Sequence, residues 1–140
     1  MLGVYVHFPW CRKVCPYCDF AVETGAPPHD AYLAAILAEL DARGPRFAGH
    51  ELASIYFGGG TPSLWRVACV ARAIEAVHAR FGRSIEVTLE ANPTDCTAEH
   101  LAAWRAAGVS RVSIGVQSFD TRELVMLGRD HRFGDGGAAI

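Results

Sequence analysis

The chain alternates short β-type segments with helical segments, and no other feature of the sequence restricts the possible fold as strongly. Four segments are rich in β-branched and aromatic residues, as strands are: residues 3–8 (GVYVHF), 53–57 (ASIYF), 84–90 (SIEVTLE) and 110–116 (SRVSIGV). A stretch with helical character follows each of them. Because such units join parallel strands through crossover helices, the sequence predicts an α/β fold with a parallel sheet and helices on its outside.

The helical segments carry start and stop signals. The predicted N-cap residues are, in chain order, Asp30, Ser63, Thr97 and Asp120. Glu123 stands three residues after the last of them, which is a capping-box pattern. Glycines are predicted to end the first three helices: Gly44, Gly82 and Gly108. These signals place short loops between the strands and the helices.

The number of units and the end of the chain suggest an incomplete domain. Four βα units cannot close an eight-stranded barrel, and residues 134–140 (GDGGAAI) are glycine-rich and then apolar, as if a further element were beginning. We therefore expect a single domain over residues 1–140 that is truncated at its C-terminus. Periodicity alone leaves open whether its sheet is flat or curls into a partial barrel.

Composition excludes several classes of function. The 140 residues carry a formal net charge of −2, so no basic surface for nucleic acid is expected. No apolar run reaches the roughly 20 residues of a membrane span, and no signal-peptide pattern opens the chain. Three of the five cysteines are crowded together. This usage favours a metal or redox site in a reducing compartment, and we expect a cytoplasmic protein.

The crowded cysteines follow the first predicted strand with the spacing C-x3-C-x2-C, at Cys11, Cys15 and Cys18. Three thiolates can hold three corners of a [4Fe–4S] cluster and leave the fourth iron open to a small molecule. A zinc site of the Cys3His type is an alternative, with His7 as the fourth ligand. Unliganded thiols are a third reading.

If the thiols are unliganded, the cations beside them should affect their reactivity. Arg12 and Lys13 flank the loop, and we expect such cations to lower the pKa of the thiols and make them reactive. The remaining cysteines, Cys69 and Cys96, are given no ligand role.

Glycine-rich or polar residues follow the other three predicted strands, namely residues 58–62 (GGGTP), Glu90 and Gln117. Because the carboxyl ends of parallel strands meet at one edge of a sheet, these motifs are expected to lie beside the cysteine loop. Each has a plainer reading. The glycines could form only a tight turn, Glu90 could be a solvated carboxylate, and Arg129 could be a charge near the end of the fourth helix.

Together the motifs resemble the radical S-adenosylmethionine (SAM) superfamily, whose hallmark is C-x3-C-x2-C with an aromatic residue before the last cysteine, here Tyr17. Within it the chain is similar to the oxygen-independent coproporphyrinogen III oxidase group, and especially to its HemW-like branch of heme chaperones. Five segments, spanning essentially the whole chain, carry the likeness: VYVHFPWCRKVCPYCDF, YFGGGTPS, LEANP, GVQSF and LGRDH. The oxidase proper has a further cysteine where this chain has Phe20, which favours the HemW-like branch.

The resemblance implies the N-terminal portion of a partial parallel (β/α) barrel, in which the three cysteines ligate a [4Fe–4S] cluster and SAM chelates the open iron. Eight residues match the family's SAM contacts: Tyr5, Tyr17, Gly59, Gly60, Thr61, Glu90, Gln117 and Arg129. The implied partners are heme or porphyrin, a heme-acceptor protein and an electron donor. No catalytic or heme-binding residue is assigned.

Three functions follow as hypotheses. The first is a heme chaperone of the HemW type. The second is an enzyme, an oxygen-independent coproporphyrinogen III oxidase that performs radical oxidative decarboxylation. The third is a structural module stabilised by zinc.

Overall fold

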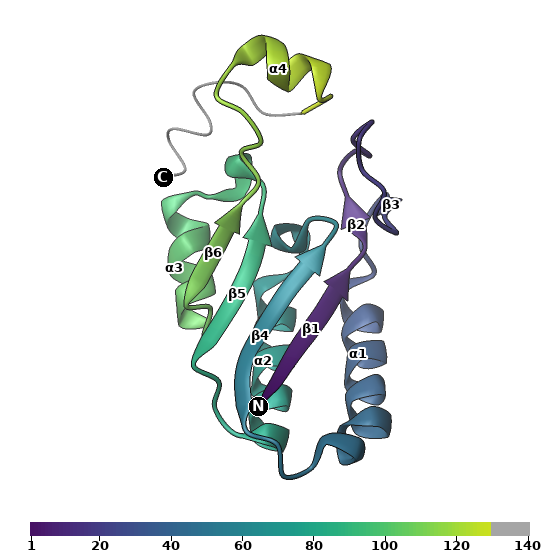
Figure 1. The fold of residues 1–140 in the computed structure, drawn as a ribbon, viewed down its shortest axis with the longest axis vertical. Helices are drawn as coiled ribbons and strands as arrows, with labels where there is room; N and C mark the ends of the chain where they lie inside the picture. Colours follow the sequence, from purple (N-terminus) through teal and green to yellow (C-terminus); the bar gives the residue numbers. More distant parts are fainter. Residues whose placement is uncertain (130–140) are drawn as a thin grey trace.

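The computed structural model describes residues 1–129 and contains a four-stranded sheet in the order β1-β4-β5-β6, in which all neighbours are parallel (Figure 1). Its strands are β1 (Leu2–Phe8), β4 (Leu52–Gly59), β5 (Glu86–Ala91) and β6 (Arg111–Ile114). The predicted α/β class and the parallel sheet are confirmed. The strand boundaries differ from the predicted ones by only a few residues, as expected where a strand frays into its loop.

The four α-helices of the described residues are α1 (His29–Arg43), α2 (Val67–Phe81), α3 (Ala98–Ala106) and α4 (Thr121–Met126). Figure 1 shows α1, α2 and α3 on one face of the sheet, whereas α4 lies beyond the carboxyl ends of the strands. The opposite face of the sheet therefore carries no helix within residues 1–129. As a result, the strand ends and one broad sheet face are open to ligands.

The core lies between the sheet and the helices. Ile55, Phe57 and Leu89 are fully buried on the central strands, and α2 covers them with Val70 and Ile74. The side chains of these strands that face the helices are apolar because they meet α2 rather than water. Helix α1 has no fully buried residue and is therefore packed less tightly than α2.

A small second sheet was not predicted. Strand β2 (Trp10–Cys11) pairs in parallel with β3 (Glu23–Thr24), and Glu23 N–H also donates to the Pro9 carbonyl at 2.8 Å. These bonds join the two ends of the loop that carries the cysteines. Two residues per strand are too few to give a detectable alternation in sequence.

Two of the four predicted N-caps are confirmed and two are wrong. Thr97 accepts the N–H of His100, and Asp120 accepts that of Arg122, so these two residues cap α3 and α4. Asp30 instead lies inside the first turn of α1, where a carboxylate still interacts favourably with the helix dipole. Ser63 lies in a separate 3₁₀ turn, Pro62–Leu64, before α2 begins.

No helix within residues 1–129 has the length and apolar character needed to span a membrane. The last two residues of the LGRDH segment and the glycine-rich residues 134–140 lie outside the described residues.

Candidate functional site

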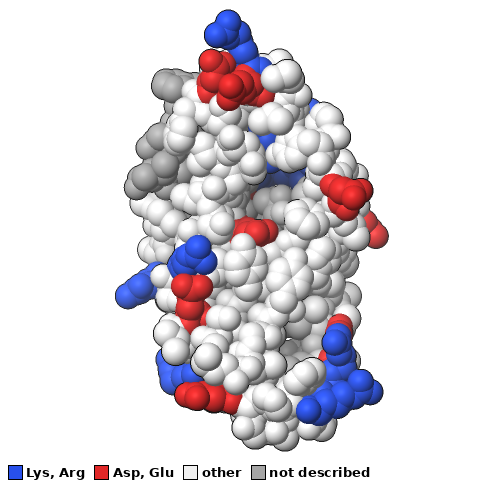
Figure 2. All heavy atoms as spheres, in the orientation of Figure 1, with Lys and Arg blue, Asp and Glu red and all other residues white. Residues whose placement is uncertain are grey.

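The loops after all four strands meet around one cavity of about 330 Å³ at the carboxyl edge of the sheet. The predicted site residues that line it are Cys11, Cys15, Tyr17, Cys18, Gly59, Gly60, Thr61, Glu90, Gln117 and Arg129. In Figure 2 an acidic and a basic side chain are recessed into a hollow on this face, while the area below it is largely uncharged. Segments more than a hundred residues apart in sequence thus form one site.

The thiol of Cys11 is held by the glycine-rich loop. Thr61 Oγ1 donates a hydrogen bond to Cys11 Sγ at 3.5 Å. Burial raises the pKa of the Cys11 thiol, and the nearby Cys18 and Cys15 raise it further, whereas the hydrogen bond from Thr61 and the charge of Arg129 act in the opposite direction. A hydrogen bond to a thiolate sulfur is one of the means by which a protein tunes an iron–sulfur cluster.

The expectation that Arg12 lowers the pKa of the neighbouring thiols is wrong for Cys11. The Arg12 guanidinium turns to the carboxylate of Asp95, donating from Nη1 at 3.2 Å and from Nη2 at 2.5 Å. Arg129, from the far end of the chain, does reach the thiols, because its Nη1 donates to Cys15 Sγ at 3.5 Å. Adjacency in sequence therefore did not reveal the contribution of Arg129 to the pKa of Cys11.

His7 does not join the cysteines. Its Nε2 donates to the carbonyl of Ala21 at 3.0 Å, and its Nδ1 is hydrogen-bonded to the Tyr5 hydroxyl at 3.1 Å, so both ring nitrogens are already engaged. Within residues 1–129 no three His, Cys, Asp or Glu side chains stand close enough together to hold a single metal ion. A Cys3His zinc site would need His7, whose ring nitrogens bond elsewhere, whereas a cluster needs only one thiolate for each of three irons.

The glycines of the second loop serve close packing. A Cβ on Gly60 would lie 2.7 Å from the Trp10 carbonyl oxygen, and Gly59 has φ of +110° with His7 against it. The loop is tied to the neighbouring segment because Gly60 N–H donates to Phe8 O at 2.7 Å and Thr61 N–H donates to Trp10 O at 2.8 Å. The glycine-rich loop therefore lies directly against the start of the cysteine loop.

Glu90 is not a freely solvated carboxylate. Its Oε1 accepts the hydroxyl of Tyr56 at 2.6 Å and its Oε2 accepts the N–H of Gly59 at 3.2 Å. The bond to Glu90 is also the main reason why the pKa of Tyr56 is raised. Each carboxylate oxygen keeps a second lone pair with which it can accept a ligand hydroxyl. Tyr56 was not predicted, since nothing in its own sequence context distinguishes it from a strand aromatic.

Gln117 and Arg129 line the same cavity as the cysteines. Gln117 is the only non-glycine residue with positive φ (65°) within residues 1–129, and such strained positions are concentrated at functional sites. Arg129 Nη2 donates to the Gly115 carbonyl at 2.9 Å, which turns its side chain into the cavity rather than along α4.

One nitrogen of the Arg129 guanidinium is available to a ligand. Its Nε is buried and has no hydrogen-bond partner among residues 1–129. A buried donor without a partner is costly, and an anionic ligand in the cavity would satisfy it. Three thiols, an acceptor at Glu90 and a free donor at Arg129 fit an iron–sulfur cluster with a ligand that carries hydroxyls and a carboxylate.

Tyr5 is the one predicted site residue that the structure leaves outside this cavity. Its ring stacks beside Tyr56 on the open sheet face, with centroids 6.1 Å apart, and burial together with Glu90 raises its pKa. Tyr5 instead lines a second cavity of about 600 Å³, which lies between β1 and α1. It is thus near Glu90 but not among the thiols.

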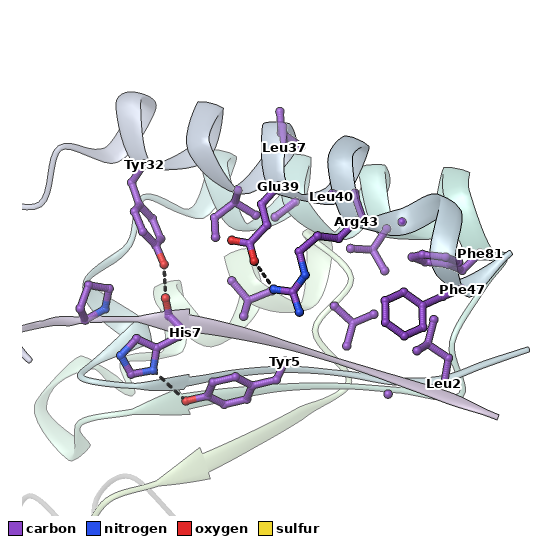
Figure 3. Close-up of a pocket in the computed structure, with 18 residues that line it drawn as sticks. Leu2, Tyr5, His7, Tyr32, Leu37, Glu39, Leu40, Arg43, Phe47 and Phe81 are labelled. Carbon is purple, nitrogen blue, oxygen red and sulfur yellow. Dashed lines mark hydrogen bonds and ion pairs between the residues drawn. The ribbon is translucent and has the colours of Figure 1, made fainter. Parts of the chain in front are cut away.

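The second cavity is larger, but it lies at the side of the sheet (Figure 3). Its walls are mainly apolar, with Leu2, Leu40 and Phe47 among them, and its polar groups bond to one another. Glu39 pairs with Arg43, and the hydroxyl of Tyr32 donates to the His7 carbonyl. The smaller cavity is the better candidate site, because it holds the thiols and the unsatisfied donor.

Comparison with known proteins agrees with this choice. Residues 5–135 match the family model of the radical SAM superfamily. The chain is 42% identical over 134 residues to the heme chaperone HemW of Escherichia coli, covering 93% of this chain and 35% of that protein. It is 45% identical over 132 residues to radical S-adenosyl methionine domain-containing protein 1, mitochondrial, of Bos taurus, covering 92% of this chain and 30% of the relative.

A solved structure shows the same fold. The coproporphyrinogen III oxidase HemN of Escherichia coli, described as a radical SAM enzyme, superposes with a TM-score of 0.85 at 30% identity over 98% of this chain and 32% of that one. The chain thus spans about a third of the length of the relatives it matches. The predicted partial parallel barrel agrees with this neighbour.

Proposed function

Because this chain belongs to the radical SAM superfamily, we propose that its cavity binds a [4Fe–4S] cluster and, at the open iron, SAM. Cys11, Cys15 and Cys18 are the proposed cluster ligands. The observation that carries the proposal is that the three thiols share one cavity with Glu90 and with the Nε of Arg129, which has no hydrogen-bond partner in the described part of the chain. Thiols alone would also suit other metals, but these additional groups match an organic ligand.

The chain's own residues have separable tasks in this proposal. Arg129 Nε would donate to the carboxylate of SAM, and Glu90 would accept from ribose hydroxyls with the lone pairs that Tyr56 and Gly59 leave free. Thr61 donates to the sulfur of Cys11 and so steadies that ligand. When bound, the reduced cluster and SAM supply the radical chemistry of this superfamily.

For the longer protein to which such a domain belongs, we propose the role of a heme chaperone. The support is the similarity to several proteins named heme chaperone HemW, at 42% identity for Escherichia coli and 38% for Haemophilus influenzae. Phe20 adds to this, because the oxidase pattern has a cysteine at that position. Heme, an acceptor protein and an electron donor are the partners of this proposal, and the cytoplasm is its proposed location.

A coproporphyrinogen III oxidase activity is the second candidate, favoured by the TM-score of 0.85 to the Escherichia coli enzyme. The two are separated by assaying the longer protein for heme retention, through the Soret band, and for turnover of coproporphyrinogen. Formation of protoporphyrinogen would overturn the chaperone proposal.

The cofactor proposal is tested on the 140-residue chain itself. After anaerobic reconstitution with iron and sulfide we expect a brown protein with about four irons per chain, as a cubane requires. SAM should then alter the electron paramagnetic resonance (EPR) spectrum of the reduced cluster. A colourless chain that retains one zinc ion would contradict the proposal and would support the alternative of a structural module stabilised by zinc.

A further inference from the structure

Asp95 is the only charged residue that is buried within residues 1–129, with 4% of its surface exposed. It ends the 3₁₀ turn Pro93–Asp95, directly after β5, and it does not line the cavity. Burying a carboxylate is costly unless hydrogen bonds compensate it. The groups that donate hydrogen bonds to Asp95 therefore indicate the role of its buried carboxylate.

The donors to Asp95 come from two loops of the site. Arg12, the residue after Cys11, donates from both terminal nitrogens to the two carboxylate oxygens, at 3.2 Å and 2.5 Å. Ser63, two residues after Thr61, donates to Oδ2 at 2.6 Å. A two-pronged arginine–carboxylate pair fixes orientation as well as distance.

The rest of Asp95 is anchored to the scaffold. His100 Nδ1, from the first turns of α3, donates to the Asp95 carbonyl at 2.8 Å, and Asn92 N–H donates to Ser63 Oγ at 3.3 Å. The carboxylate thus joins the cysteine loop and the glycine-rich loop to the end of β5. Both loops are otherwise held to each other mainly through backbone contacts beside Gly60.

We propose that Asp95 is a positioning residue, which sets the spacing of the cysteine loop from the glycine-rich loop and so presents Cys11 to the cluster and the cavity to SAM. This inference rests on the proposed cofactor binding. Asp95 does not itself line the cavity, and it acts through Arg12 and Ser63.

The two side chains of the Arg12–Asp95 ion pair differ in exposure, so variants of each can separate an effect on the position of the loops from an effect on stability. The Arg12 side chain is 45% exposed, whereas that of Asp95 is 6% exposed. In Asp95→Asn the guanidinium can turn to water, so the chain should stay folded. In Arg12→Met the buried carboxylate loses its main partner, and breaking a buried pair from one side is strongly destabilising. The double variant Arg12→Met/Asp95→Asn leaves neither charge.

The experiment compares these three variants with the wild type and with Glu75→Gln, which breaks an exposed ion pair to Arg72 on α2. Thermal unfolding of the cluster-free chain measures stability. Iron content, and the SAM affinity obtained from the EPR change of the reduced cluster, measure the site.

We expect Asp95→Asn and the double variant to unfold near the wild-type temperature and to bind SAM about 10- to 100-fold more weakly, as is usual when a group supporting a metal ligand is lost. Arg12→Met should lose stability as well. Should Asp95→Asn fail to fold, Ser63→Ala removes one donor to Asp95, together with an acceptor of the Asn92 N–H, and should weaken SAM binding in the same direction.

Two outcomes would overturn the inference, and they are distinguishable. If the wild type binds iron and SAM and the double variant matches it in both, Asp95 is only a stabilising residue and the cofactor proposal stands. If the wild type takes up no iron, the cofactor proposal fails and this inference fails with it.

Discussion

Gly60→Ala should uncouple the two loops of the site, because the glycine is needed for their close approach. The added Cβ would lie 2.7 Å from the Trp10 carbonyl oxygen and 2.8 Å from the Pro9 carbonyl carbon and oxygen. All three are backbone atoms, so no side-chain rotation relieves the contact. Either the glycine-rich loop or the start of the cysteine loop must move.

The cost follows from the type of contact. Forcing an extra methyl group into a packed site costs about 1–3 kcal/mol. With a urea m-value of about 2 kcal/mol/M, typical of small proteins, the unfolding midpoint should fall by about 0.5–1.5 M. The shift should also lengthen the hydrogen bond from Thr61 to Cys11 and lower the iron content after reconstitution.

The matched control is Gly3→Ala on β1. A Cβ there meets only Ser54 Oγ at 3.6 Å, which is ordinary van der Waals contact, so the midpoint should stay level or rise slightly. Urea denaturation of both variants, followed by circular dichroism, gives the comparison. Equal midpoints for Gly60→Ala and the wild type would refute the argument that this glycine serves loop packing.

Other predictions concern individual groups. Cys15→Ala should abolish the brown chromophore, whereas Cys69→Ala, which changes a buried thiol on α2, should leave it intact; equal loss in both would contradict the ligand assignment. Arg129→Lys should weaken SAM binding at least about tenfold, because an ammonium cannot reproduce the donors of a guanidinium; an unchanged affinity by EPR titration would remove Arg129 from the site. Burial raises the pKa of Tyr32 to about 12, so its contribution to stability is complete below its ordinary pKa of about 10 and is lost as the pH rises from there toward 12. Tyr32→Phe should therefore reduce the loss of unfolding free energy in that alkaline range, and an unchanged slope would show that Tyr32 does not contribute.

The local features of the chain were predictable because they depend on residues close in sequence. The four strands follow from runs of β-branched and aromatic residues, and the caps at Thr97 and Asp120 from short polar side chains just before a helix. The two wrong caps show the limit of such signals. Pro28 precedes the first turn of α1 and begins it earlier than Asp30, while the hydroxyl of Ser63 is bound by a carboxylate 32 residues away.

The sequence by itself determined the parallel α/β architecture and the spacing of the three thiols, since period and adjacency are properties of neighbouring residues. Only the tertiary structure decided which groups meet. Arg12 pairs with Asp95, and Arg129 donates a hydrogen bond to Cys15. The His7 ring is hydrogen-bonded to the Tyr5 hydroxyl and the Ala21 carbonyl. These contacts join residues up to 114 positions apart. They depend on how the strands align in the sheet, and that alignment is a result of packing the whole chain rather than of any one segment.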